Sequence, residues 1–309
     1  MKPLVKIGTR GSPLALYQTE VVSSKLRGLF PLVQVEIVKI HTKGDMIRRG
    51  GPGLIGARIF TQEIEKALLA KEIDLAVHSA KDLATELPAG LEIGAVLERE
   101  DPRDCLVARG GQTLRQLPQG AQIGTSSLRR KSQLKRLRRD LQIIEVRGNI
   151  ETRLRKVEEG TCDGVVLAHA GLKRLGLADR VTEVFDEELF LPQAGQGTIA
   201  VEVRKNELQI SEMVKPFNCM SSFYHLLAER SFLGRLEGGC QVPVGVSSKI
   251  EGNSIVLKAA IFSLDGEREI SATLKGTTQT AGETGIRLAD QLLTSGGREI
   301  LDEIRSSLK

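Results

Sequence analysis

The chain has 309 residues, enough for two or three hydrophobic cores, and a formal net charge of +5. It contains no Trp and only two Tyr, which argues against a protein that reads nucleic-acid bases by aromatic stacking. No apolar stretch approaches the roughly 18 residues of a membrane span, and the first residues resemble neither a signal peptide nor a transit peptide.

The first hundred residues alternate between strand and helix patterns, with strands expected at 4–7, 33–40 and 73–77 and helices after Pro13 and at 59–70. Ser12 and Pro13 form a helix start that suits an anion. Residues 42–58 are rich in Gly and in basic residues, which predicts a mobile loop such as a lid. His78 to Asp82 follow the third strand, at the carboxyl end where open α/β sheets bind ligands.

A second α/β unit is predicted after residues 98–104, which read EREDPRD and look like a charged linker. Strands at 121–124, 142–146 and 164–167 alternate with helices that end near 139, 159 and 175, and this alternation implies a parallel sheet. Gly/Pro breaks near 100 and 195, followed by a strand at 198–203, suggest that the chain leaves the first domain and returns to it. The two segments near 100 and 195, which would connect the first domain with the second, would then form a hinge over a cleft.

The last ninety residues predict a small α+β domain, with a helix at 221–236, strands at 244–250, 255–262 and 269–274, and helices at 281–293 and 298–307. The expected fold class is therefore α/β, with two doubly wound domains and a small α+β C-terminal domain. The expected boundaries are 1–98 with 198–216 for domain 1, 104–192 for domain 2 and 220–309 for domain 3.

The loop that holds Cys240 has two interpretations. Gly238 and Gly239 allow another group to approach the backbone closely, and Pro243 prevents a helix. Cys240 is either a small buried residue in a turn or a covalent attachment point. The four cysteines form no Cys-x-x-Cys pair and no histidine set lies near them. We therefore expect reduced thiols in the cytoplasm and no metal site.

The middle of the chain carries a dense basic cluster with three interpretations. A solvated face suits 135–139, and a nucleic-acid groove is weakened by the lack of aromatic residues. A site for several carboxylates is favoured, because Arg129, Arg130 and Arg147 follow the carboxyl ends of predicted strands. The cluster consists of Arg129, Arg130, Lys131, Lys135, Arg136, Arg138, Arg139, Arg147, Arg153, Arg155 and Lys156.

Lys81 and Asp82 also follow a predicted strand. They could form a surface ion pair without function. Alternatively, a carboxylate among many cations is well placed to bind ligand N–H groups or to stabilise a developing positive charge.

Eight segments cover nearly the whole chain in one order: TRGSPLAL (9–16), AVHSAKD (76–82), EREDPRD (98–104), GTSSLRR (124–130), RGN (147–149), AGLKRLG (170–176), GQG (195–197) and LEGGCQVP (236–243). Together they resemble the porphobilinogen deaminase (hydroxymethylbilane synthase) family. The resemblance implies two hinged domains similar to type II periplasmic binding proteins, and a dipyrromethane cofactor joined by a thioether to Cys240. It implies a transferase of tetrapyrrole (heme- or chlorophyll-type) biosynthesis that adds four porphobilinogen molecules head to tail, releases ammonia each time and frees hydroxymethylbilane by hydrolysis.

The resemblance also implies roles for single residues. Asp82 is expected to be catalytic: it would contact pyrrole N–H groups, assist loss of the amine and stabilise the azafulvene cation. Porphobilinogen is the expected partner of a monomeric enzyme that binds no nucleic acid and no membrane. The cofactor is expected to contact Cys240, Lys81, Asp82, Thr125, Ser126, Ser127, Arg129, Arg130, Arg147 and Gly148. The substrate and growing chain are expected to contact Arg10, Ser12, Phe60, Arg147, Arg153, Ala168, Arg174 and Gln196.

The chain departs from the family pattern in one place. Where the family usually has Gly-Gly-Lys-Gly-Leu-Phe, residues 55–60 read IGARIF, so the lysine is missing at 57 and Arg58 is a candidate substitute. The alternative class is a non-catalytic protein that binds an anionic small molecule in the same hinged cleft. Such a protein has no use for a Gly-Gly-Cys loop and would carry no covalent pyrrole.

Overall fold

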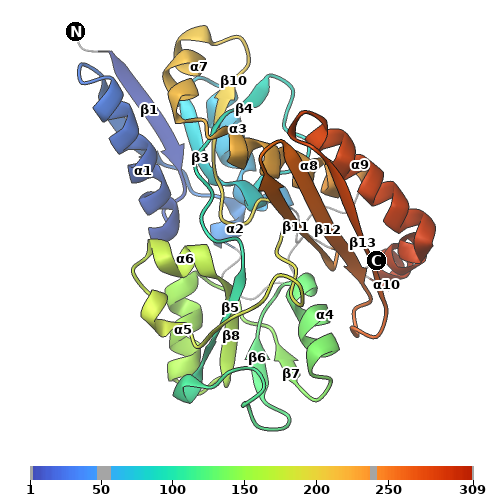
Figure 1. Ribbon diagram of the computed structural model, residues 1–309. Coiled ribbons are helices and arrows are strands. Elements are labelled where there is room, and N and C mark those ends of the chain that lie inside the picture. Colours follow the sequence, from blue (N-terminus) through green and yellow to red (C-terminus); the bar gives the residue numbers. More distant parts are fainter. Residues whose placement is uncertain (1–2, 47–56, 237–241, 308–309) are drawn as a thin grey trace. The chain divides into compact units, whose positions relative to one another are not determined.

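The computed structural model describes residues 3–46, 57–236 and 242–307, and the chain divides into two compact units (Figure 1). The first unit consists of Met1–Glu100 and Thr198–Leu226, and the second of Asp101–Gly197 and Leu227–Lys309. Each unit therefore takes two separate stretches of the chain. The helix α8 (Met220–Arg235) passes from the first unit into the second.

The first unit contains one mixed five-stranded sheet. The strands β1, β2 and β3 run parallel to one another, whereas β10 is antiparallel to both of its neighbours. All residues of β10 are buried, as expected for a strand that is covered on both faces. From edge to edge the strands are β2 (Gln34–Lys39), β1 (Leu4–Thr9), β3 (Leu75–Ser79), β10 (Ile199–Arg204) and β4 (Leu91–Val96).

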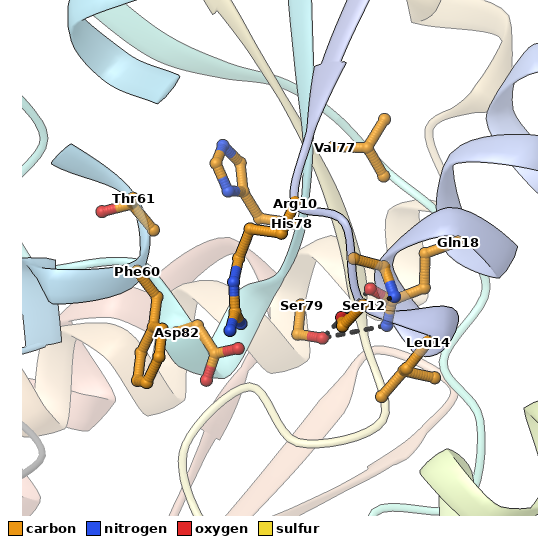
Figure 2. Close-up of a pocket in the computed structure, with 11 residues that line it drawn as sticks. Arg10, Ser12, Leu14, Gln18, Phe60, Thr61, Val77, His78, Ser79 and Asp82 are labelled. Atoms are coloured by element: carbon orange, nitrogen blue, oxygen red, sulfur yellow. Dashed lines mark hydrogen bonds between the residues drawn. The ribbon is translucent and has the colours of Figure 1, made fainter. Parts of the chain in front are cut away.

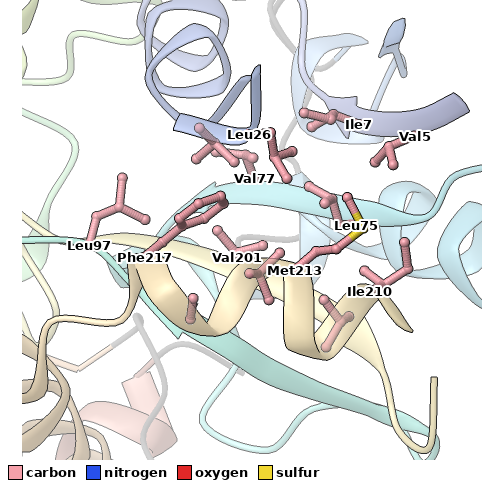
Figure 3. Packing of buried hydrophobic residues seen from close by; sticks show 14 of the residues in the cluster. Val5, Ile7, Leu26, Leu75, Val77, Leu97, Val201, Ile210, Met213 and Phe217 are labelled. Atoms are coloured by element: carbon pink, nitrogen blue, oxygen red, sulfur yellow. The ribbon is translucent and has the colours of Figure 1, made fainter. Parts of the chain in front are cut away.

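Helices cover both faces of this sheet and bury an aliphatic core. One face packs against α1 and α7 (Figure 3), and the opposite face packs against α3. The helical elements are α1 (Pro13–Leu29), α2 (Lys43–Met46), α3 (Gln62–Leu69) and α7 (Leu208–Val214), with short 3₁₀ turns at η2 (Ala57–Phe60), η3 (Ala80–Asp82) and η6 (Lys215–Phe217). The core residues include Ile7, Leu26, Val77, Val201 and Met213 on the first face and Ile64, Leu68, Ile73 and Leu91 on the second.

The second unit contains a five-stranded sheet with the same arrangement. Its strands β6, β7 and β8 are parallel, and β5 is antiparallel to both of its neighbours. In order they are β7 (Gln142–Ile144), β6 (Gln122–Gly124), β8 (Gly164–Ala168), β5 (Asp104–Ala108) and β9 (Glu183–Val184). The helical elements are α4 (Leu128–Leu137), α5 (Ile150–Glu158) and α6 (His169–Arg174), with 3₁₀ turns at η4 (Arg109–Gly111) and η5 (Ala178–Arg180).

A three-stranded antiparallel sheet also belongs to the second unit, and α9 packs against one face of it. The turn between its last two strands lies directly on α4: a Cβ at Gly266 would stand 2.4 Å from the carbonyl oxygen of Ser132. The small sheet is thereby attached to α4. Its elements are β11 (Val244–Glu251), β12 (Ser254–Phe262), β13 (Glu269–Thr277), η8 (Thr278–Thr280), α9 (Ala281–Leu292), the π-helical turn η9 (Leu293–Gly297) and α10 (Arg298–Ser307).

The predicted fold class is confirmed: two α/β sheets of like topology are accompanied by a small α+β region. The prediction of a parallel sheet in the second unit is met by β6, β7 and β8, whereas β5, which was not predicted, runs antiparallel to both of its neighbours. A strand that arrives through a loop from a distant part of the chain pairs antiparallel without a crossover helix. The predicted linker 98–104 was wrong at its last residue, because Asp104 begins β5. The strand β4 and the helix α7 were not predicted, and the division into three domains stays a prediction.

Candidate functional site

A pocket opens in the first unit where β1 meets α1 and β3 meets η3 (Figure 2). Four of the predicted site residues line it, and they come from three separate stretches of sequence. The lining residues are Arg10, Ser12, Leu14, Ala15, Gln18, Phe60, Thr61, Val77, His78, Ser79 and Asp82. Arg10, Ser12, Phe60 and Asp82, which the sequence offered as site residues, therefore lie around one pocket.

The start of α1 forms one wall of the pocket. Ser12 is the N-cap residue: its hydroxyl accepts a hydrogen bond from the backbone nitrogen of Ala15 at 3.3 Å, and Pro13 opens the helix. Gln18, one turn further, lies with its amide 2.9 Å from the hydroxyl oxygen of Ser79. This contact fixes α1 to the end of β3, so that the helix start and the catalytic candidate Asp82 belong to one rigid wall.

Arg10 and Phe60 form the opposite wall. The guanidinium carbon of Arg10 lies 4.3 Å from the centre of the Phe60 ring, which is a cation–π contact. Figure 2 shows that the guanidinium group of Arg10 and the carboxylate of Asp82 project into the same space. Positive charge, an aromatic face and a carboxylate thus line one small cavity. Residues 47–56 of the predicted lid, and the side chains of Ala57 and Arg58, lie outside the described part of the chain.

In the second unit the start of α4 carries the predicted Thr-Ser-Ser segment. Ser127 caps the helix: its hydroxyl accepts from the backbone nitrogen of Arg130 at 3.4 Å, and its own nitrogen donates to the hydroxyl of Thr125 at 3.2 Å. The hydroxyl of Ser126 donates to the carbonyl oxygen of Val146 at 2.9 Å. These contacts hold the positive end of the helix dipole in a fixed orientation.

The guanidinium groups of Arg129 and Arg130 are buried. Both donate to Asp104, which is fully buried at the start of β5, with N–O distances of 2.6 Å from Arg129 and 2.7 Å from Arg130. Burial alone would raise the pKa of Asp104, but the two arginines outweigh it and hold that pKa well below its usual range. Burial lowers the pKa of Arg129, and Asp104 offsets this only in part.

The glycine-rich segment 193–197 meets the same cluster. Gln196 donates from Nε2 to Asp104 at 3.0 Å, and Arg174 donates to the carbonyl oxygen of Gly197 at 2.6 Å. Gly195 has a positive φ of 73°, and its nitrogen donates to the buried carboxylate of Glu229 at 2.8 Å. Gln196 and Arg174 therefore belong to one connected network in the second unit.

The remaining predicted site residues of this unit lie at other strand ends. Arg147 is 40% exposed and donates to Glu145 at 2.6 Å. Arg153 donates to the carbonyl oxygen of Gly148 at 2.9 Å, and Gly148 has a positive φ of 120°. Ala168 caps the start of α6. These residues carry charge and flexible backbone at the carboxyl ends of β7 and β8.

The predicted solvated face at 135–139 is met in part: Arg136 and Arg139 are exposed, whereas Lys135 and Arg138 are half-buried. Lys135 donates to the carbonyl oxygen of Leu141 at 2.6 Å, and Arg136 pairs with Glu269 of the small sheet. Arg138 donates to the carbonyl oxygens of Leu114 and Leu117, at 2.8 and 3.0 Å, and pairs with Asp140. Their charges hold the fold of the second unit together, which sequence could not show because the partners are distant in the chain.

Cys240 lies outside the described residues. Cys105, Cys162 and Cys219 are free thiols, and burial raises the pKa of Cys105 to about 12. Within the described ranges, no group of His, Cys, Asp and Glu has the arrangement of a metal site. Neither does any helix in those ranges have the length and apolar character needed to cross a membrane.

Two functional candidates were missed by sequence reasoning. Asp104 was assigned to a linker, although two arginines depend on it. His78, which was left without a role, lines the pocket and contacts the buried Glu202. Gln18 and Ser79 also line the pocket. The sequence signal for His78, Ser79 and Asp104 is their position at strand ends, next to residues that were already recognised, whereas Gln18 lies within α1 and has no such signal.

Comparisons with known proteins agree with this geometry. A family model described as "Porphobilinogen deaminase, dipyromethane cofactor binding domain" matches residues 5–212, and a second, for the C-terminal domain of the same family, matches residues 223–294. A porphobilinogen deaminase from Carboxydothermus hydrogenoformans is 48% identical over 99% of this chain and 98% of the relative. Another from Geobacter sulfurreducens is 46% identical over 97% of this chain and 94% of the relative.

Among solved structures, the methionine binding protein MetQ is similar with a TM-score of 0.46 and 14% identity, covering 72% of this chain and 90% of that protein. Because that score is low, the fold assignment rests on the sheet topology described above. The two family models and the full-length relatives establish the family. The chain belongs to the porphobilinogen deaminase (hydroxymethylbilane synthase) family, transferases that carry a dipyrromethane cofactor and polymerise porphobilinogen in tetrapyrrole biosynthesis.

Proposed function

We propose that this chain joins four porphobilinogen molecules head to tail, releases one ammonia at each addition and frees hydroxymethylbilane by hydrolysis. The growing chain is primed by dipyrromethane, attached through a thioether to Cys240. The observation that carries the proposal is the pocket of the first unit, which places the carboxylate of Asp82 beside Arg10 and the ring of Phe60. A pyrrole with acidic side chains needs such a combination of charge and aromatic surface.

Asp82 has the catalytic role in this proposal. Loss of the amine from porphobilinogen leaves positive charge on the substrate, and a fixed carboxylate stabilises that charge most where it is largest. Asp82 can also transfer to the leaving amine the proton that it needs. Arg10 and the capped start of α1 at Ser12 supply positive potential for the substrate carboxylates. Phe60 supplies an apolar face at the mouth of the pocket.

The residues of the second unit fit a cofactor that brings two carboxylates on each pyrrole. Nε and Nη2 of Arg129 are buried and have no hydrogen-bond partner among the described residues, which suits an additional acceptor. Lys81, Thr125, Ser126, Ser127, Arg129, Arg130, Arg147 and Gly148 would hold the cofactor, together with Asp82. Arg147, Arg153, Ala168, Arg174 and Gln196 would hold the growing chain. The cofactor supplies the carbon nucleophile for the first addition.

The proposal also covers the domain organisation of the chain, its cellular compartment and its oligomeric state. The three sheets support three domains, 1–98 with 198–216, 104–192 and 220–309. The three described cysteines are free thiols, which supports a reducing cytoplasm. We expect a monomer. We also expect no nucleic-acid partner, because Arg129, Arg130, Arg136, Arg138, Arg139 and Arg147 pair with protein carboxylates. Light scattering on the purified protein tests the monomer, and a salt series with polynucleotide tests the second expectation.

The decisive experiment is the mass of the intact protein. The chain should exceed its sequence mass by two linked pyrroles, and peptide mapping should place the excess on Cys240. Because the chain has four cysteines, thiol titration of the denatured loaded chain should then find three. The variant Cys240→Ser should also titrate with three thiols, but it should show no excess mass and no activity. Full activity in that variant would refute the attachment site.

A further inference from the structure

Asp104 stands at the centre of the buried polar cluster in the second unit. Its carboxylate receives hydrogen bonds from Arg129, Arg130 and Gln196, and its side chain is completely inaccessible to solvent. We infer that Asp104 is a positioning residue, which orients the two guanidinium groups so that one edge of Arg129 is left for a single ligand carboxylate. The inference rests on the proposed function, in which this cluster holds the cofactor.

Arg130 uses all of its nitrogen atoms inside the protein. Nε and Nη2 donate to Oδ1 of Asp104 at 3.1 and 2.7 Å, and Nη1 donates to the carbonyl oxygen of Val166 at 2.8 Å. The contact with Asp104 occupies the Nε/Nη2 edge, which is the edge that otherwise grips a carboxylate. Arg130 therefore acts on a ligand through its charge and through Asp104.

Among the described residues, Arg129 uses only one of its nitrogen atoms for hydrogen bonds. Nη1 donates to Oδ2 of Asp104 and to the carbonyl oxygen of Leu191, both at 2.6 Å. Nε and Nη2 are buried and make no hydrogen bond within the described part of the chain. These two groups point the same way from the planar guanidinium and form the fork that matches a carboxylate. Buried donors of this kind are costly unless they are paired.

The charges of the cluster agree with one additional anion. Arg129 and Arg130 contribute two positive charges, and Asp104, whose pKa is held low, contributes one negative charge. Within this cluster one positive charge is therefore left, on side chains that are less than a tenth exposed. A single bound carboxylate neutralises it, whereas a second would leave an excess of buried negative charge.

Gln133 holds the neighbouring segment at Leu191, and within the described ranges its side chain forms no hydrogen bond with either guanidinium group or with Asp104. The side-chain amide of Gln133 accepts from the nitrogen of Leu191 at 2.6 Å and donates to the carbonyl oxygen of Leu191 at 3.0 Å. The same carbonyl oxygen accepts from Arg129. Gln133 thus stabilises the segment without touching Asp104, which makes it a matched control for an effect that is only structural.

The test compares Asp104→Glu with Gln133→Leu in the full chain. Asp104→Glu keeps the negative charge but moves it by one methylene, so the cluster is not left with two uncompensated cations. We expect the variant to fold and the fraction of chains that carry the two-pyrrole mass to fall about tenfold, the factor for one hydrogen bond to a charged group. Gln133→Leu should lower the melting temperature and keep the loaded fraction of the parent.

A loaded fraction in Asp104→Glu equal to that of the parent would overturn the inference. So would parallel losses of loading and melting temperature in both variants, since Asp104 would then be only structural. If the parent carries no two-pyrrole mass, the proposed function itself fails, and the two failures are distinguishable.

A second measurement does not depend on the folding of a variant. Nitrogen-15 spectra of the loaded parent and of the parent produced without porphobilinogen should show a shift of the Nε resonance of Arg129. The Nε resonance of Arg130, which already donates to Asp104, should stay in place. A shift of Arg130 alone would contradict the inference.

Discussion

His78 and Glu202 meet in the interior of the first unit, where Nε2 of His78 lies 3.0 Å from Oε2 of Glu202. The two side chains are 3% and 0% exposed. They stand on the neighbouring antiparallel strands β3 and β10, two register positions apart on the same face. Oε1 of Glu202 is buried without a hydrogen-bond partner in the described ranges, so His78 is its main support.

This pair should contribute to the stability of the pocket wall. His78→Leu and Glu202→Leu each leave one buried polar group unpaired, which should cost about 1–3 kcal/mol of the free energy of unfolding. The double variant should cost less than the sum, because neither group is then left behind. Urea unfolding of all four proteins measures the coupling. Strictly additive losses would show that the pair is not coupled.

Asp82 should be needed for turnover rather than for folding. Asp82→Asn keeps the shape of the side chain and removes its charge, and ammonia release per loaded chain should fall by at least about 10²-fold. Asp82→Glu should retain more activity, because the charge survives although its position changes. Intact mass should show cofactor on both variants. Near-normal ammonia release in a loaded Asp82→Asn protein would remove Asp82 from the mechanism.

Arg147 should act on a ligand and contribute little to stability. Its side chain is 40% exposed and pairs with Glu145, and exposed pairs are worth less than about 1 kcal/mol. Arg147→Lys keeps the charge but loses the planar fork. Turnover of porphobilinogen should fall strongly while the melting temperature changes little. Equal losses of both would identify Arg147 as a structural residue.

Gly266 should be essential for the contact between the small sheet and α4. Its φ is +76°, and a Cβ would lie 2.4 Å from the carbonyl oxygen of Ser132. Gly252 is the matched control, with φ +58° and no atom within 4 Å of a Cβ. Gly252→Ala should cost about 1–2 kcal/mol from backbone strain alone, and Gly266→Ala should cost clearly more. Thermal unfolding compares them, and equal losses would show that the close approach is unimportant.

Acid should destabilise the second unit through its carboxylates. The arginine partners hold the folded-state pKa of Asp104 below the value of about 3.9 that an unfolded Asp has. The stabilisation is therefore complete above that pH and is lost as the pH falls toward the folded-state pKa. Unfolding free energies between pH 6 and pH 3 should decline only in the lower part of this range. Stability that is unchanged at low pH would contradict the paired charge of Asp104.

The local parts of the fold could be predicted from the sequence. Ser12, Pro13 and Ser127 mark helix starts through their own backbone preferences, and the structure has α1 and α4 beginning beside them. Periodicity located most helices and parallel strands for the same reason. Helix-start residues and hydrophobic periodicity each depend on a few neighbouring residues, so distant parts of the chain do not alter them.

The partners of charged residues could not be predicted in the same way. Asp104 ends a run of charges around Pro102 that is typical of a linker, and its burial depends on arginines 25 and 26 residues later. The sequence gives Arg136 no partner, because Glu269, with which it pairs at the surface, lies far along the chain. The sequence identified which residue types bind carboxylates, but it could not show which of them already have a carboxylate within the protein.

The first sheet includes β10, which comes after all strands of the second sheet in the sequence, and this order has a consequence for synthesis on the ribosome. All strands of the second sheet have left the ribosome once Val184 has emerged, although this sheet lies later in the sequence than β1 to β4. The earlier sheet has to wait for β10, so the nascent chain exposes the unpaired edges of β3 and β4 during that interval. The later-encoded sheet can therefore be completed first, and the waiting edges are where a nascent chain is most vulnerable to pairing with a neighbour.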